Sequence, residues 1–215
     1  MHTWIDALLV LLVLTTLLML GSSRISTCIK MAAVQGIGLG VLTLLTQRVD
    51  LELLVFALVS SGLKGFAFPW LLRRAQRVAG VEREVEPLAG YAVSVLAGVG
   101  TLAVAVWLSA RLPLPMPAVS PLIVPVALFT LLAGLFLIVS RRKAITQVIG
   151  YLVLENGIYT LGMVIARDEP LLVQLGVLLD LFVGVFVMGI AIFHISRAFD
   201  HIDTDQLVAL KDGEP

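Results

Sequence analysis

Residues 141–162 read RRKAITQVIGYLVLENGIYTLG. Three basic residues open this stretch, and a long, mostly apolar run follows with one acid, Glu155, near its middle. Because a transmembrane helix needs about 20 mostly apolar residues, the run predicts a membrane span over residues 144–165. Glu155 would then lie about 16 Å from the basic end, near the midplane of a hydrocarbon core about 30 Å thick. An ionisable residue at that depth is costly and usually marks an ion pathway or a proton relay.

The composition of the whole chain is typical of a membrane protein. Of its 215 residues, 59% are hydrophobic and only 14% are charged, whereas soluble domains carry about 25% charged residues. The net charge of zero argues against a nucleic-acid partner. A single cysteine, Cys28, excludes an internal disulfide and a cysteine metal cluster. No metal-ligand spacing links the three histidines, and we find no catalytic motif.

The apolar runs and the basic residues together predict a topology. Seven segments qualify as membrane spans: residues 4–22, 28–46, 51–71, 88–110, 122–140, 144–165 and 171–195. Eleven Lys and Arg residues fall in one set of connections and three in the opposite set. The positive-inside rule places the richer set in the cytoplasm. We therefore predict an all-α, polytopic membrane protein with seven transmembrane helices, its N-terminus outside and its C-terminus cytoplasmic.

Two further ionisable residues lie within predicted spans. Lys64 is about 20 Å from the outer end of the third span, and Asp180 reaches a depth similar to that of Glu155 in the seventh. Small residues before Lys64 and Pro69 after it suggest a kinked helix with room for water. Burial favours the neutral form of each group and a nearby opposite charge favours the ionised form, so a balanced site can change protonation when a neighbour moves. We predict that Lys64, Glu155 and Asp180 are proton-relay residues.

Other polar residues in the spans are candidates for supporting roles. We expect Asn156, Gln147 and Gln174 to assist the relay. Asn156 could equally have a structural role, in which it hydrogen-bonds to another helix and stabilises helix packing. A structural alternative also stands for the charges, in which Lys64 pairs with one of the acids as an interhelical lock.

The small residues of the second span form a separate signal. Gly36 and Gly40 match a GxxxG pattern, which predicts close packing of the second span against another helix.

The C-terminal half resembles a known family. The stretch 141–162 and the later LLDLFVGVFVMGIAIF (178–193) resemble two helices of the small K-type subunit of bacterial respiratory complex I, and the C subunit of multisubunit Na+/H+ antiporters is similar. Asp180 falls where the K-type subunit has its last-helix glutamate. The other glutamate of that subunit aligns with Leu152, whereas this chain has its acid at Glu155, on the same helix face.

A resemblance over the whole chain is closer. Lys64 followed by Pro69, the run GYLVLENG (150–157) and the closing DTDQLVALKD (203–212) are similar to the hydrogenase 4 component E family. This resemblance implies a membrane-arm subunit of a hydrogenase-4-type, complex-I-related redox complex of the formate hydrogenlyase class, taking part in proton or sodium translocation across the bacterial inner membrane. It also implies three regions, which are a four-helix transmembrane region (1–120), a K-subunit-like three-helix region (121–195) and a cytoplasmic tail (196–215).

The same resemblance implies the partners. These are antiporter-like large membrane subunits, other membrane-arm subunits and a peripheral [NiFe]-hydrogenase module, all in the lipid bilayer or at its surface. The [NiFe] centre and the iron–sulfur clusters are expected in those partner subunits, with no cofactor in this chain.

Three other interpretations stay open. The chain could be a subunit of a multisubunit Na+/H+ antiporter, or a purely structural or assembly subunit. A standalone secondary transporter would need an internal repeat, and none is evident in the sequence.

Overall fold

The structure is a computed structural model that describes residues 2–46, 51–78, 88–112, 119–165 and 189. Long helices make up most of these residues. The elements are α1 (His2–Gly21), α2 (Ile25–Thr46), α3 (Leu51–Gly62), the π-helical segment η1 (Leu63–Ala67), α4 (Phe68–Val78), α5 (Tyr91–Ser109), α6 (Ile123–Ser140) and α7 (Ala144–Ile165). The prediction of an all-α chain is confirmed for these residues.

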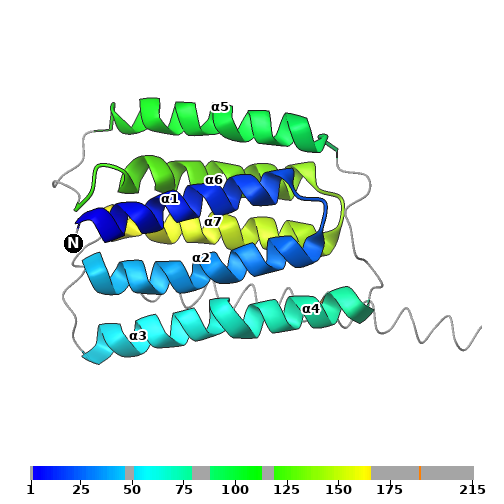
Figure 1. Ribbon diagram of the computed structural model, residues 1–215, viewed down its shortest axis with the longest axis horizontal. Helices are drawn as coiled ribbons and strands as arrows, with labels where there is room; N and C mark the ends of the chain where they lie inside the picture. The colour runs from blue at the N-terminus through cyan, green and yellow to red at the C-terminus, as the bar shows by residue number, and fades with distance from the viewer. Residues whose placement is uncertain (1, 47–50, 79–87, 113–118, 166–188, 190–215) are drawn as a thin grey trace, which may run out of the picture.

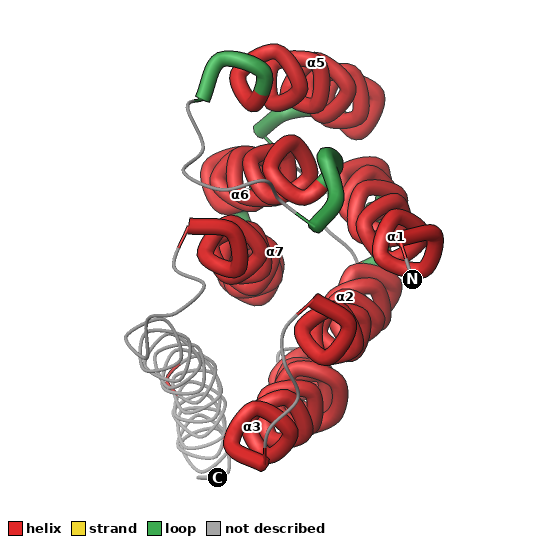
Figure 2. Tube along the Cα trace, turned by 90° about the vertical axis from the view of Figure 1, so that its left-hand side faces the viewer, coloured by secondary structure: helices red, strands yellow, loops and turns green. Residues whose placement is uncertain are grey.

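The helices lie side by side as a bundle of rods. α3, η1 and α4 form one continuous rod, and consecutive rods run in alternate directions (Figure 1). Viewed nearly end-on, α6 lies between α5 and α7, and α2 lies between α1 and α3 (Figure 2). α1 also packs against α6, and α2 contacts α7. The helices of the two predicted transmembrane regions therefore pack against each other.

Glycines bring α6 and α7 closest together, and this pair makes the most extensive contact in the described bundle. A Cβ atom on Gly134 would lie 2.6 Å from Cα of Leu154, and one on Gly157 would lie 2.7 Å from Cα of Leu131. Because carbon atoms normally pack at about 3.5–4.0 Å, neither position has room for a side chain. Close backbone approach at small residues is the usual means of packing helices in lipid.

Five described stretches are long and apolar enough to cross a membrane: Thr3–Gly21, Ile25–Thr46, Leu53–Val78, Tyr91–Ser109 and Ile123–Ser140. Large apolar side chains point away from the bundle, as shown by Leu58, Leu96 and Val139, which are 63%, 71% and 72% exposed. Such a surface is unfavourable in water but suits a bilayer. The chain is a membrane protein whose apolar residues cover the outside as well as the inside.

The predicted spans agree well with the helices. Predicted span 144–165 coincides with α7, which is not among the five apolar stretches. The third predicted span, 51–71, is too short, since the rod continues to Val78. The second was predicted to begin at residue 28, whereas α2 begins at Ile25. The seventh predicted span, 171–195, lies outside the described residues.

Candidate functional site

Lys64 sits where the third rod departs from α-helical geometry. In η1 the N–H of Phe68 donates to the carbonyl of Leu63, five residues earlier. Pro69 has no N–H, so it cannot complete the ordinary bond to the carbonyl of Gly65. A π-turn absorbs such a local mismatch, and π-turns occur frequently at functional sites. The side chain of Lys64 leaves the rod at this irregular turn and is buried.

Lys64 forms an ion pair with Glu155 of α7. Its Nζ lies 2.5 Å from Oε1 of Glu155, and the two side chains are 6% and 2% exposed. Gly36 of α2 makes the approach possible, because a Cβ at that position would collide with the Cβ of Lys64. Gly40 has the same effect a turn further along α2, where a Cβ would collide with the hydroxyl of Ser61. The prediction that Gly36 and Gly40 allow close helix packing is confirmed.

Tyr159 packs over the ammonium group of Lys64. Nζ lies 5.6 Å from the centroid of the Tyr159 ring, within the range of a cation–π interaction. The phenol oxygen is 2.9 Å from Oγ1 of Thr43 in α2, and the ring of Phe56 in α3 lies 6.2 Å away between centroids. Tyr159 of α7, which covers the ammonium group, is therefore contacted in turn by side chains from α2 and α3.

A buried amide network continues from this site toward α1. Nε2 of Gln35 lies 2.9 Å from Oγ1 of Thr15, 2.8 Å from Oγ1 of Thr16 and 3.3 Å from the carbonyl oxygen of Leu12. On the other side, Nδ2 of Asn156 donates to Oε1 of Gln35 at 3.2 Å. Gln35 and Asn156 are 1% and 2% exposed. Polar contacts thus run across α1, α2 and α7 to the residue next to Glu155.

The predicted site residues do not all fall in one place. Lys64 and Glu155 pair between the third rod and α7, and Asn156 follows Glu155 directly in α7. Gln147 lies near the start of α7, where its Nε2 donates to the carbonyl of Arg141 at 2.9 Å, about 12 Å along the helix from Glu155. Asp180 and Gln174 lie outside the described residues.

The sequence analysis did not identify five residues that the structure places in or beside this site: Thr15, Thr16, Gln35, Thr43 and Tyr159. A signal for one of them was present, because Gln35 is a strongly polar residue inside an apolar span and directly precedes Gly36. The threonines gave no such signal, since a threonine in a membrane helix commonly bonds its own backbone.

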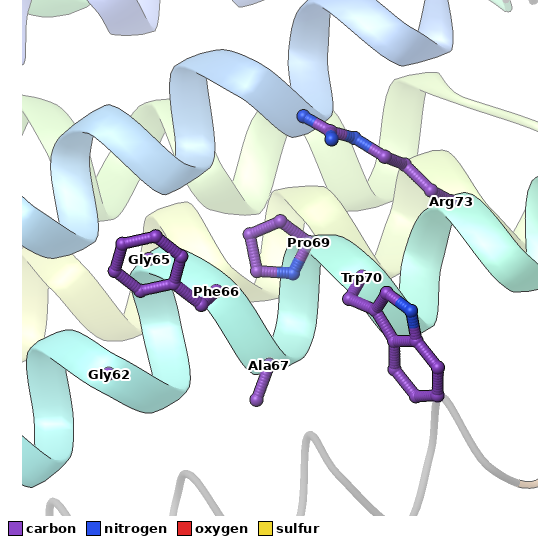
Figure 3. A pocket seen from close by; sticks show the side chains of 7 residues that line it. All are labelled: Gly62, Gly65, Phe66, Ala67, Pro69, Trp70 and Arg73. Atoms are coloured by element: carbon purple, nitrogen blue, oxygen red, sulfur yellow. The ribbon is translucent and has the colours of Figure 1, made fainter.

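A hollow of about 660 Å³ lies along the third rod, close to Lys64 in sequence (Figure 3). Its lining residues are Gly62, Gly65, Phe66, Ala67, Pro69, Trp70 and Arg73. Trp70 and Arg73 point to opposite sides of the rod (Figure 3). Arg73 is the one charged residue in this lining, so the hollow offers little chemistry beside the ion pair.

The chemistry of the site rests on its two charged groups. Within the described ranges, no three His, Cys, Asp or Glu residues are grouped so that they could hold a metal ion. The Lys64–Glu155 pair brings together one amine and one carboxylate, which are the ionisable groups of this site.

Comparison with known proteins finds a relative along nearly the full chain and shorter matches to Hydrogenase-4 component E. Hydrogenase-4 component E of Escherichia coli is 37% identical over 86 residues, which cover 40% of each chain. The Mycobacterium tuberculosis protein named "Uncharacterized protein Rv0085" is 31% identical over 204 residues, covering 94% of this chain and 93% of the relative. No family model and no solved structure matches. The chain therefore belongs to the family of the Mycobacterium tuberculosis protein Rv0085.

Proposed function

We propose that this chain is a membrane-arm subunit of a hydrogenase-4-type, complex-I-related redox complex, and that its buried Lys64–Glu155 pair belongs to a proton path. The ion pair is the observation that carries the proposal, because it lies between apolar helices where charge is costly. The match to Hydrogenase-4 component E over 86 residues supports the class of complex.

The pair has the properties that a proton site needs. Each partner stabilises the charge of the other, while burial disfavours both charges. A charge arriving nearby, or a shift of the η1 turn, would upset this balance and lead one partner to gain or lose a proton. In this proposal Glu155 holds the proton, Lys64 tunes its affinity, and Asp180 continues the path in the seventh span.

The arrangement of basic residues supports the proposed topology. Consecutive rods alternate in direction, so the ends of α1, α4 and α6 lie at the same end of the bundle (Figure 1). Arg24, residues 73–77 and residues 141–143 gather at that end. By the positive-inside rule, this end of the bundle faces the cytoplasm. In the proposed topology the N-terminus lies outside and the chain crosses a bacterial inner membrane seven times. The regions 1–120, 121–195 and 196–215 keep the roles that the family resemblance implies.

The partners follow from the class of complex. Antiporter-like large subunits and other membrane-arm subunits would flank this chain, and a peripheral [NiFe]-hydrogenase module would hold the nickel and iron–sulfur cofactors. This chain contributes protonatable groups between those subunits and carries no redox centre of its own.

A structural lock is the second candidate function, and the same ion pair favours it. Glu155, Lys64 and Tyr159 join the third rod to α7, which an assembly subunit could need for shape alone. Removing one partner of a buried pair leaves an uncompensated charge and costs about 3–5 kcal/mol, whereas removing both is often neutral. A double variant therefore separates a lock from a proton site.

The test compares Glu155→Gln, Lys64→Met and the double variant Lys64→Met/Glu155→Leu, in which both charged residues become apolar, in inverted membrane vesicles that contain the complex. Native gels measure assembled complex, and a pH-sensitive dye measures protons moved per hydrogen turned over. We expect each single variant to lower assembly, and the double variant to restore assembly without restoring proton translocation. Asp6→Asn is the matched control, since Asp6 accepts a 2.6 Å hydrogen bond from Ser120 near the start of α1.

Two results would count against the proposal. Proton translocation at the parental ratio in the assembled double variant would show that the pair is only a lock. A purified chain that transports alone would instead indicate a secondary transporter.

A further inference from the structure

The orientation of the Gln35 amide is fixed by its partners on α1. The carbonyl oxygen of Leu12 can only accept a hydrogen bond, so Nε2 of Gln35 must face it. The hydroxyls of Thr15 and Thr16 donate their own hydrogens to main-chain carbonyls of α1, at 2.7 and 2.8 Å. They therefore offer Gln35 only lone pairs. Three acceptors hold Nε2 toward α1, and Oε1 consequently faces α7.

This orientation in turn fixes the amide of Asn156. Because Gln35 presents an oxygen, Asn156 must present its nitrogen, and Nδ2 lies 3.2 Å from Oε1. The amide oxygen, Oδ1, then points away from Gln35. It is buried and has no hydrogen-bond partner among the described residues. A buried acceptor left without a donor is unfavourable, and a bound water is the usual explanation.

Asn156, which carries the unsatisfied oxygen, is a sequence neighbour of the ion pair. Asn156 directly follows Glu155 in α7, and Gln35 directly precedes Gly36, whose backbone packs against Lys64. The amide pair and the ion pair thus occupy neighbouring positions on the same helices. A water molecule bound to Oδ1 at this place would have the carboxylate and the ammonium group as further polar neighbours.

We propose that Gln35 is a positioning residue for the proton site, which turns the amide oxygen of Asn156 toward a buried water next to the Lys64–Glu155 pair. This inference rests on the proposed function and deepens it. A hydronium ion at the water position gives one proton to the carboxylate of Glu155, leaving neutral water and a carboxylic acid, and the reverse step returns the proton. Gln35 and Asn156 keep their hydrogens and only orient the water.

Radiolytic hydroxyl-radical labelling of the intact complex in lipid nanodiscs tests this inference, because radicals formed from bound water oxidise the side chains beside it. Tyr159 follows Asn156 by three residues and shares its helix face, so it reports on the proposed water. Tyr91, at the start of α5 beside Arg141, is the internal reference. We expect oxidation of Tyr159 relative to Tyr91 in the parent, and a several-fold loss in Gln35→Leu.

Two further variants keep the test sharp. Thr16→Val is the matched control, because it leaves Gln35 two of its three acceptors and should preserve parental labelling. Asn156→Leu removes the amide oxygen itself and should abolish labelling of Tyr159. If Gln35→Leu fails to assemble on native gels, Gln35→Met replaces it with a side chain of similar length.

The outcomes also separate this inference from the proposed function. An unlabelled Tyr159 in the parent, or equal labelling in the parent and Gln35→Leu, would overturn the inference. Labelling reads water directly and does not depend on pumping. Normal pumping in the Lys64–Glu155 double variant together with a labelled Tyr159 would therefore reject the proposed function and leave the water site standing.

Discussion

Gly157→Ala is expected to destabilise the bundle by forcing α7 away from α6. The new Cβ would lie 2.7 Å from Cα of Leu131 and 2.9 Å from the carbonyl oxygen of Ala127, both rigid backbone atoms. Since ordinary contact distances are about 3.5–4.0 Å, one helix must move by about 1 Å. Overpacking of this kind costs about 1–3 kcal/mol. The displaced helix also carries Glu155, so the distance to Lys64 should change with it.

Gly100→Ala is the matched control for this prediction. Gly100 lies inside α5, and a Cβ there meets nothing within 4 Å. Replacing a helical glycine by alanine in open space stabilises by about 0.5–1 kcal/mol. Thermal unfolding in detergent, followed by tryptophan fluorescence, should show a lower Tm for Gly157→Ala and an equal or higher Tm for Gly100→Ala. A Tm for Gly157→Ala at or above the parent would refute the close packing of α6 on α7.

Three further predictions concern individual contacts. Arg141 is 1% exposed, donates to the carbonyl of Leu20 at 2.6 Å and lies 4.8 Å from the centroid of the Tyr91 ring. Arg141→Met removes this charged hydrogen bond and should lower the stability by about 1.5–3 kcal/mol, measured by thermal unfolding. Gly36→Ala should push Lys64 off its position and lower both the yield of complex on native gels and the protons moved per turnover of the complex that still assembles, because the added Cβ collides with the Cβ of the lysine. Tyr159→Phe removes only the hydroxyl that hydrogen-bonds with Thr43 and should lower the free energy of unfolding by about 0.5–1.5 kcal/mol in the same assay. Tyr159→Ala should lower it further, because the ring over the Lys64 ammonium group is lost as well.

Much of the helical architecture could be predicted from the sequence, for a simple physical reason. A membrane fixes the length of an apolar run, so residues 122–140 and 144–165 matched α6 and α7 within one residue. The end of the third rod was misplaced because residues 73–78 are mostly polar and yet remain helical beyond the apolar stretch. Hydropathy marks the stretch of a helix that lies in lipid, and it does not mark where hydrogen bonding stops.

The candidate site was only partly predictable, because side-chain partners depend on which helix faces which. Counting residues placed Lys64 and Glu155 well inside their predicted spans, but the sequence left open whether Lys64 pairs with Glu155 or Asp180. The structure pairs it with Glu155, through a π-turn and a glycine contact that no local pattern specifies. The partner of Gln35 was equally hidden, since Thr15, Thr16 and Asn156 are far from it along the chain.

The polar residues of this bundle carry two tasks that are hard to separate. Apolar side chains gain little from leaving lipid for a protein interface, so the order of helices in a membrane depends on close glycine contacts and polar bonds. Here those contacts are Gly36 against Lys64, the Lys64–Glu155 pair, and the link from Gln35 to Asn156. The pair that we propose to move a proton thus also helps to hold α2, α7 and the third rod together. A single substitution that stops pumping therefore does not show whether proton transfer or helix packing was lost. A double variant of Lys64 and Glu155 that assembles normally and still fails to pump would show that the pair is needed for proton transfer itself.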